Sequence, residues 1–264
     1  MLPELVALAV PPRCAACRAP CRRAAVVLCE DCRGALPWLA AGCCCPRCAL
    51  PLPHVRGRRC PARDAAFGAA WSAVAYAGVA RELLHALKFA AARPLATVMA
   101  EQIAAAVPPS MLTGTRPAAD PLEGSMSAPG PPGQTGVTIV AVPPHPLRRR
   151  SRGFDPADLI ARALARRTGL PLTPALRRRS APSRQLGASR ETRLMRDRLG
   201  FQACAGAPRH VVLVDDVHTT GATLDACARA LRDAGAERVV AVTWARTCDG
   251  TTSVENEHVH AYHR

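Results

Sequence analysis

The chain has 264 residues, a formal net charge of +15 and an aromatic content of 3%. That length is enough to bury a substantial core in one large domain or two smaller ones. No run of about twenty apolar residues is present, which excludes a membrane-spanning helix. The excess of positive charge favours phosphates or nucleic acid as partners.

Residues 1–10, MLPELVALAV, form a short apolar stretch that carries Glu4 and lacks a basic start. A secretory signal needs a positively charged start and a cleavage site, so we expect a short packing helix here. We therefore expect a cytoplasmic protein with no membrane insertion. In that compartment, Cys-x-x-Cys pairs serve as metal ligands rather than as disulfides.

The first sixty residues hold ten of the thirteen cysteines and show little hydrophobic periodicity. We expect residues 1–63 to form a cysteine-rich module that needs metal to fold. Two Cys-x-x-Cys turns can together surround one tetrahedral Zn²⁺. One complete set of four thiolates is therefore predicted: Cys14, Cys17, Cys29 and Cys32. The alternative for these residues is a set of reduced free thiols.

A second cysteine set is incomplete. Its members are Cys45, Cys48 and Cys60. Arg63 stands where a fourth cysteine is expected, so Cys43 or Cys44 could complete the site, or the site could be degenerate. An arrangement in which the first and third Cys-x-x-Cys pairs share one metal is also open. Every such thiolate site would be structural, and the remaining cysteines are expected to be core thiols: Cys204, Cys227 and Cys248.

The second part of the chain, residues 64–264, begins with a strand and two helices. Residues 69–76 read as a strand, and residues 79–89 repeat leucines at helical spacing. Residues 95–106 predict a second helix, which Pro108 stops.

Residues 108–136 contain eighteen Pro, Gly, Ser or Thr among twenty-nine residues. Such a composition cannot bury enough apolar surface to offset the entropy of ordering. A flexible insertion is therefore expected between the second helix and the next strand.

After the insertion, strands and helices alternate. The expected elements are a strand at 137–142, a helix at 156–168, a strand at 210–214, a helix at 222–234 and a strand at 238–245. Strand, helix and strand joined by short connections make a βαβ unit. The sequence therefore predicts an α/β fold with a largely parallel sheet.

The stretch 145–201 is strongly basic, with fifteen Arg against four acidic residues. A basic surface of this kind suits phosphate groups or single-stranded DNA. Because aromatic residues are scarce, DNA contacts would go mainly to phosphates. The alternative is a bias in genome composition, since Lys88 is the one lysine in a chain rich in Arg, Ala and Pro.

Residues 211–224, VVLVDDVHTTGATL, place two carboxylates and three threonines directly after an apolar strand. In parallel sheets, ligands bind beyond the carboxyl ends of the strands. Backbone N–H groups in the glycine-containing turn 219–223, at a helix N-terminus, suit one phosphate group. Asp215 and Asp216 suit sugar hydroxyls or Mg²⁺. A ribose 5-phosphate satisfies both halves, whereas an ordinary strand-to-helix turn needs only one capping residue.

The order of apolar strand, Asp-Asp, two residues and Thr-Gly-x-Thr resembles the phosphoribosyl diphosphate (PRPP) motif of type I phosphoribosyltransferases. Other matching segments are Tyr76-Ala-Gly, Leu87-Lys88-Phe89, Val142-Pro143 with Arg148, Arg152-Gly153-Phe154, Gln185, Arg193 and Phe201. With them, nearly the whole chain outside the insertion is similar to the ComF family. Those proteins are competence-associated and phosphoribosyltransferase-like, with an N-terminal double zinc ribbon. The resemblance implies a zinc-ribbon module at 1–63 and a phosphoribosyltransferase-like parallel sheet with flanking helices at 64–264.

The resemblance also implies a PRPP site. Asp215 and Asp216 would hold the ribose hydroxyls, directly or through Mg²⁺. The residues expected around the 5-phosphate are Thr219, Thr220, Gly221, Ala222 and Thr223. Arg148 and Arg152 would neutralise the diphosphate as it leaves.

Two departures from the family pattern bear on turnover. Asp155-Pro156 stands where the family usually has Asn-Gln, and Arg196 stands where it usually has Asn. Either change could alter the acceptor or abolish transfer while sparing the PRPP site. No general base is evident, since His145 and His218 read as solvated loop residues.

Three functions are compatible with these features. The first is PRPP binding linked to competence and DNA uptake, with phosphoribosyl transfer to an unknown acceptor and competence or DNA-processing proteins as partners. The second is a non-catalytic accessory protein that binds single-stranded DNA. The third is a PRPP-sensing regulator.

Overall fold

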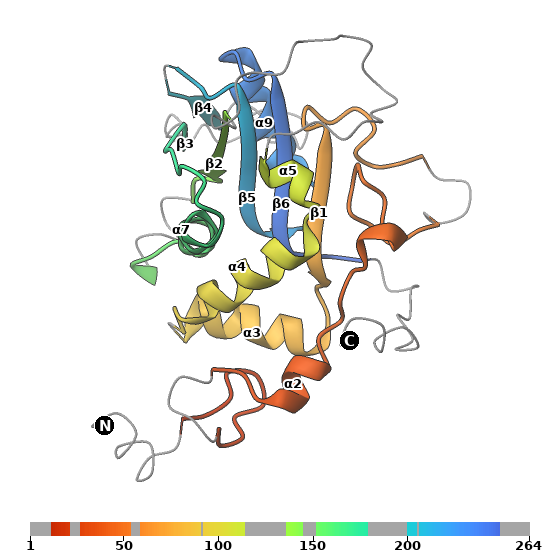
Figure 1. Cartoon of the computed structure of the whole chain (residues 1–264), viewed down its shortest axis with the longest axis vertical. Coiled ribbons are helices and arrows are strands. Elements are labelled where there is room, and N and C mark those ends of the chain that lie inside the picture. Colours follow the sequence, from red (N-terminus) through yellow and green to blue (C-terminus); the bar gives the residue numbers. More distant parts are fainter. Residues whose placement is uncertain are drawn as a thin grey trace, which may run out of the picture.

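The computed structural model describes residues 12–21, 27–53, 59–90, 92–113, 136–144, 152–178, 200–204 and 206–248. Its centre is a four-stranded sheet in the order β1-β6-β5-β2 (Figure 1). The strands are β1 (Ala69–Ala75), β2 (Val137–Ala141), β5 (His210–His218) and β6 (Arg238–Arg246). All three pairings are parallel, which confirms the predicted α/β fold.

Helices cover both faces of this sheet (Figure 1). On one face, α4 (Leu95–Ala106) and α7 (Pro156–Thr168) lie against the strands, and α3 (Gly78–Phe89) packs beside α4. On the other face lie α9 (Ala222–Asp233) and a small antiparallel hairpin of β3 (Leu176–Arg178) and β4 (Phe201–Ala203). The two faces bury two separate hydrophobic cores.

The cysteine-rich residues divide between these two cores. Cys14, Cys21 and Cys32 are buried with the leucines of α3 and α4. Cys45 and Cys48 are buried with α9 on the opposite face. The regular elements here are short: α2 (Glu30–Gly34) and a 3-10 turn at Ala41–Cys43. Packing against the sheet domain therefore stabilises segments that have few elements of their own.

Three parts of the fold differ from the sequence prediction. The strand predicted at 210–214 continues to His218, so the two aspartates lie within β5 and not after it. The β3–β4 hairpin was not predicted. The stretch 108–136 begins with a short helix, α5 (Pro109–Thr113), and residues 114–135 lie outside the described residues, as does the helix expected at 1–10.

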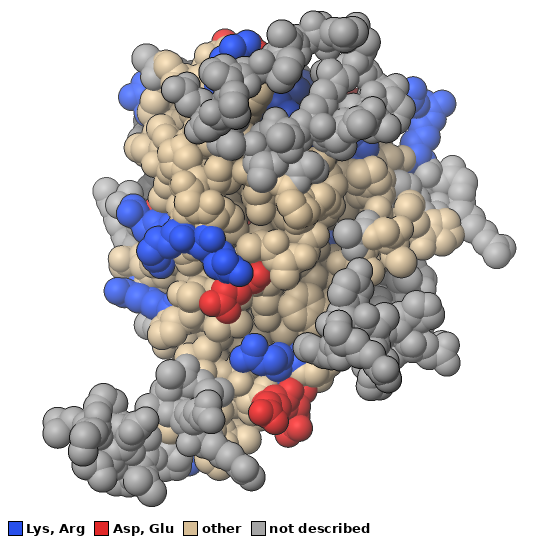
Figure 2. Space-filling model, viewed as in Figure 1, with Lys and Arg blue, Asp and Glu red and all other residues tan. Residues whose placement is uncertain are grey.

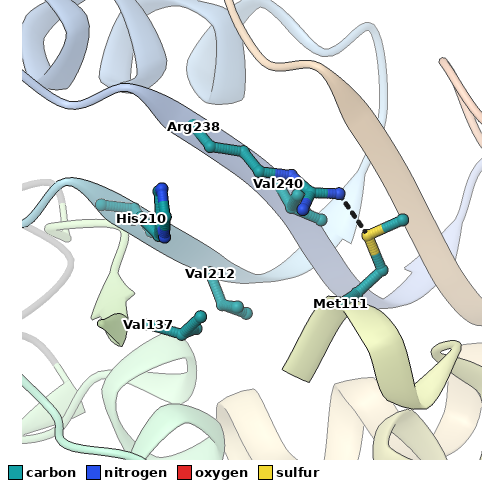
Figure 3. A pocket seen from close by; sticks show the side chains of 7 residues that line it. Met111, Val137, His210, Val212, Arg238 and Val240 are labelled. Carbon is teal, nitrogen blue, oxygen red and sulfur yellow. Dashed lines mark hydrogen bonds between the residues drawn. The ribbon is translucent and has the colours of Figure 1, made fainter. Parts of the chain in front are cut away.

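A small pocket lies at the amino ends of β2, β5 and β6, beside α5 (Figure 3). Its walls are mostly valine side chains, and at its edge Arg238 Nη2 lies 3.1 Å from Met111 Sδ. The residues that begin the three strands line it, so it is remote from Asp215 and Asp216 at the other end of β5. Among the described residues, no helix is both long and apolar enough to cross a bilayer.

Candidate functional site

Asp215 and Asp216 lie near the carboxyl end of β5, where both side chains are half-buried. Lys88 reaches this point from the last turn of α3, and its Nζ lies 2.8 Å from Asp216 Oδ2. The side chains of Lys88 and Asp216 are only 21% and 16% exposed. The one lysine of the chain therefore balances one of the two adjacent carboxylates.

The second carboxylate, Asp215, is in a different electrostatic environment. Burial raises the pKa of Asp215 well above its ordinary value, and the negative charge of Asp216 raises it further. The backbone N–H of Asp216 donates to Asp215 Oδ1 at 2.8 Å, and this bond and Lys88 partly oppose that rise. The negative charge of Asp155 raises the pKa of Asp215 further. Asp215 therefore holds a proton more readily than an ordinary aspartate does.

The turn between β5 and α9 exposes the N-terminus of the helix. Gly221 is the N-cap residue, with φ +83°, and it offers no side chain to cap the first turn. Thr220 Oγ1 accepts a long bond of 3.4 Å from the N–H of Ala222. Thr220, Ala222 and Thr223 are exposed. Backbone donors and the positive end of the helix dipole are thus available to an anion.

His218 lies underneath this turn. It is 2% exposed, and Nδ1 has no hydrogen-bond partner among the described residues. Its ring packs edge-on against Phe67, with the ring centroids 6.1 Å apart. Burial and the nearby charge of Arg246 lower the pKa of His218 to about 3, so the imidazole is neutral. The expectation of a solvated loop histidine was wrong, because β5 continues to this residue and buries it.

The end of α3 meets the segment 152–154 through two pairs of Arg and Phe. The Arg152 guanidinium lies over the Phe89 ring at 4.7 Å, and that of Arg93 over the Phe154 ring at 5.1 Å. Phe89 is 63% exposed. Two segments that are more than sixty residues apart therefore meet beside the ion pair of Lys88. Arg148 lies outside the described residues.

The departure at Asp155-Pro156 has a local structural role. Asp155 is the N-cap of α7, and its Oδ1 accepts a hydrogen bond of 3.2 Å from the N–H of Ala157. Pro156 occupies the first helical position, where its fixed φ is favourable and no N–H is needed. Both residues therefore suit a helix start. The other departure, Arg196, and the matching Gln185 and Arg193 lie outside the described residues.

The cysteines form two clusters whose sulfur atoms lie within 4.8 Å of one another. The clusters are Cys14, Cys17, Cys29 and Cys32, and Cys45, Cys48 and Cys60. The Sγ atoms of Cys17 and Cys29 are 3.7 Å apart, and those of Cys45 and Cys60 are 3.8 Å apart. Four thiolates on a tetrahedral Zn²⁺, with bonds of about 2.3 Å, would lie about 3.8 Å apart. Both clusters therefore fit zinc.

The clusters also decide between the arrangements left open by the sequence. The first cluster joins the first two Cys-x-x-Cys pairs, and the second joins the third pair to Cys60, so the first and third pairs do not share a metal. Neither Cys43 nor Cys44 belongs to the second cluster, which has three cysteines among the described residues. Cys227 is buried as expected, whereas Cys204 and Cys248 are half-buried and are not core thiols.

Part of the chain is similar to known proteins. Residues 150–260 match the family model described as "Phosphoribosyl transferase domain". The chain is 33% identical over 106 residues to Competence protein F of Haemophilus influenzae. Residues 150–260 are thus similar to phosphoribosyltransferase domains, and part of the chain is similar to Competence protein F. The aligned part is 38% of this chain and 46% of the relative, so the chain spans about half the length of the relative that it matches.

Two residues that complete the surroundings of the motif could not be identified from the sequence alone. Lys88 was noted only for its rarity and its place in a matching segment, yet it pairs with Asp216. Arg246 ends the apolar strand β6 and is only 4% exposed. A charged residue at the end of a buried apolar strand was the signal that could have identified it.

Proposed function

We propose that this protein binds PRPP together with Mg²⁺ at the carboxyl end of β5. The observation that carries the proposal is the position of the Asp215–Asp216 pair next to the open N-terminus of α9. Asp215 and Asp216 hold the ribose hydroxyls, directly or through Mg²⁺. The 5-phosphate lies in the turn formed by Thr219, Thr220, Gly221, Ala222 and Thr223.

Lys88 fits this assignment electrostatically. Two adjacent carboxylates would repel a phosphate placed close to them. Because the ammonium group of Lys88 contacts Asp216, and Asp215 retains its proton more readily than an ordinary carboxyl group, the negative charge facing the ligand is reduced. A neutral polyol and an anion can then bind side by side.

The proposed reaction is transfer of the phosphoribosyl group. An acceptor nucleophile forms a bond to the anomeric carbon, and the bond from that carbon to the diphosphate oxygen breaks with its electron pair. Mg²⁺, when bound, neutralises part of the diphosphate charge. Arg148 and Arg152 donate hydrogen bonds to the leaving diphosphate. The stacking of Arg152 on Phe89 supports a role at this edge of the site, because it holds the guanidinium beside α3.

The two cysteine clusters are proposed to hold structural Zn²⁺ ions in a cytoplasmic protein. Four thiolates in the first cluster leave its metal no open position for a substrate. The name of the relative from Haemophilus influenzae supports a link to competence. We propose DNA uptake as the process, with competence or DNA-processing proteins as partners.

A second candidate function is binding of single-stranded DNA. One observation favours it: Phe89 is 63% exposed, and the Arg152 guanidinium lies over its ring, so an aromatic and a cationic group that can contact a nucleotide lie together at the surface. Figure 2 shows basic side chains gathered over α7, while most of the other described surface on that face is neither acidic nor basic.

A PRPP-sensing regulator would share the ligand site but release no diphosphate.

Calorimetry separates these functions. Titration of PRPP with Mg²⁺ is expected to give saturable binding, which is lost in the double variant Asp215→Asn with Asp216→Asn. Absence of PRPP binding to the intact, zinc-loaded protein would refute the proposal. If single-stranded DNA binds with a steep salt dependence while PRPP does not bind, the second function stands alone. Release of diphosphate in the presence of candidate acceptors distinguishes an enzyme from a sensor.

A further inference from the structure

We propose that Arg246 is a positioning residue that couples the second cysteine cluster to the phosphate-binding turn; this inference rests on the proposed function. Arg246 is the last residue of β6, and its guanidinium contacts three separate backbone segments. Nε donates to the carbonyl of Cys48 at 2.8 Å. Nη1 donates to the carbonyls of His218 and Thr247, each at 2.8 Å, and to that of Thr219.

These bonds, together with a bond of 3.0 Å from the Thr247 N–H to the carbonyl of His218, determine which way the peptide groups of the turn face. In a planar trans peptide, the carbonyl of one residue and the N–H of the next point in opposite directions. Arg246 draws the carbonyls of His218 and Thr219 inward, so the N–H groups of Thr219 and Thr220 point away from Arg246. That is the direction from which an anion would approach the N-terminus of α9. The positive charge of Arg246 behind the turn adds to its attraction.

The other end of this connection is a metal ligand. Cys48 is fully buried and belongs to the second cluster with Cys45 and Cys60. The turn that carries it is closed by bonds from Ala49 N–H to the carbonyl of Cys45 at 2.9 Å and from Cys45 N–H to that of Leu50 at 2.8 Å. A metal held by the Cys48 thiolate therefore fixes the peptide group whose carbonyl accepts from Arg246.

The second cluster is also attached to α9 itself. The N–H of Ala66, which follows this cluster in the chain, donates to Asp225 Oδ1 at 2.8 Å. Arg232 Nε donates to the carbonyl of Ala66 at 3.3 Å. Leu224, in the first turn of α9, shares a buried core with Cys48. The N-terminus of α9 and the turn before it are thus both attached to the chain around the second cysteine cluster.

The first cysteine cluster provides the contrast. Its buried members Cys14 and Cys32 share a core with Leu83 and Leu87 of α3, on the opposite face of the sheet. Loss of metal there should loosen the packing beside α3 before it affects the turn. Loss of metal from the second cluster is therefore predicted to weaken phosphate binding more than loss of metal from the first.

The variant Arg246→Lys tests whether the hydrogen bonds of the guanidinium group are needed. Lysine keeps the positive charge but cannot donate to Cys48 and to the turn in the same planar geometry. The matched control is Arg47→Lys. Arg47, between Cys45 and Cys48, also donates to a set of backbone carbonyls: those of Gly68, Ala62, Arg63 and Ala65. We expect Arg246→Lys to retain both zinc ions and to bind ribose 5-phosphate about tenfold more weakly, and Arg47→Lys to bind it as the wild type does.

Equal affinity in Arg246→Lys and the wild type would overturn the inference. If the wild type itself does not bind ribose 5-phosphate or PRPP, the proposed function fails instead. A second comparison uses Cys60→Ser and Cys17→Ser, each of which should lose one zinc ion by metal analysis. We expect the loss of affinity for ribose 5-phosphate to be larger in Cys60→Ser, and equal losses would contradict the coupling.

If Arg246→Lys does not fold, hydrogen exchange decides the question. The variant Cys17→Ser already lacks zinc in the first cluster, so a chelator added to it removes zinc from the second cluster alone. Hydrogen exchange is then followed in the peptide that covers residues 218–223. Faster exchange there after zinc removal supports the coupling. Unchanged exchange at 218–223, with zinc loss confirmed by metal analysis, overturns it.

Discussion

Lys88 Nζ lies 2.8 Å from Asp216 Oδ2, which joins the last turn of α3 to the carboxyl end of β5. Both side chains are mostly buried, at 21% and 16% exposure, so water screens their interaction only in part. The pair therefore has two roles: it attaches α3 to the central strand, and it sets the charge beside the proposed phosphate turn.

Replacement of Lys88 by Met should affect both roles. We expect Lys88→Met to lower the free energy of unfolding by about 2 kcal/mol, because Asp216 loses a charged hydrogen-bond partner. Ribose 5-phosphate should bind more weakly without Mg²⁺, since the acidic pair is no longer balanced, and Mg²⁺ should restore more of the affinity than in the wild type. The measurements are urea unfolding and calorimetry with and without Mg²⁺.

The control for this variant is Arg162→Met. Arg162 forms an ion pair with Asp158 on α7, but the two side chains are 58% and 38% exposed. Exposed pairs of this kind contribute little to stability. Equal losses of stability in the two variants would show that the Lys88 pair has no special importance.

The sequence alone predicted the elements whose signals are local. Residues 156–168 form a helix with the predicted bounds, because Asp155 and Pro156 begin it and Gly169, with φ +73°, ends it. The β3–β4 hairpin could not be predicted, since each strand has three residues and Leu176 and Phe201 are its main apolar members. Pairing with neighbouring strands, and not local propensity, makes these segments extended.

The candidate site also has a part that the sequence could predict and a part that it could not. The Asp-Asp and Thr-Gly-x-Thr residues are contiguous, so their chemistry could be read from the sequence. The contacts of Lys88 and Arg246 depend on how distant elements meet. The end of β5 was misjudged because aspartates rarely continue a strand, whereas parallel pairing to β6 extends it to His218.

Gly221 should be intolerant of a side chain for two reasons. Its φ of +83° is unfavourable for other residues, and an added Cβ would lie 2.8 Å from Nε2 of the buried His218. We expect Gly221→Ala to lose binding of ribose 5-phosphate, because the turn must move. The conformational cost alone is about 1 kcal/mol.

Gly169→Ala isolates that conformational cost. Gly169 has a similar φ of +73°, and an added Cβ would meet nothing within 4 Å. Unfolding experiments should show a loss of about 1 kcal/mol in Gly169→Ala, with ligand affinity unchanged. If both variants bind ribose 5-phosphate like the wild type, the turn does not hold the phosphate.

His218 should make the fold sensitive to acid. The pKa of His218 is lowered to about 3 in the folded protein from an ordinary value of 6.5, so the unfolded chain binds one more proton between these values. The stabilising contribution of neutral His218 is therefore complete above about pH 6.5 and is lost as the pH falls toward 3, by about 1.4 kcal/mol per pH unit.

This acid sensitivity is measured by urea unfolding of wild type and His218→Gln between about pH 7 and about pH 5. The difference in slope between the two proteins removes contributions from other groups, including the cysteine ligands. We expect a shallower slope in His218→Gln. Parallel slopes in the wild type and His218→Gln would refute the prediction.

Asp215 should release a proton when Mg²⁺ and PRPP bind. Burial raises its pKa in the free protein, and a bound cation favours the ionised form, so the pKa falls on binding. Affinity should therefore increase as the pH rises toward the raised pKa of the free protein. Calorimetry in two buffers with different ionisation enthalpies measures the number of protons released. Asp215→Asn should release fewer protons than Asp158→Asn, in which an exposed carboxyl on α7 is changed. Equal proton release by these two variants would mean that another group, or the ligand itself, supplies the proton.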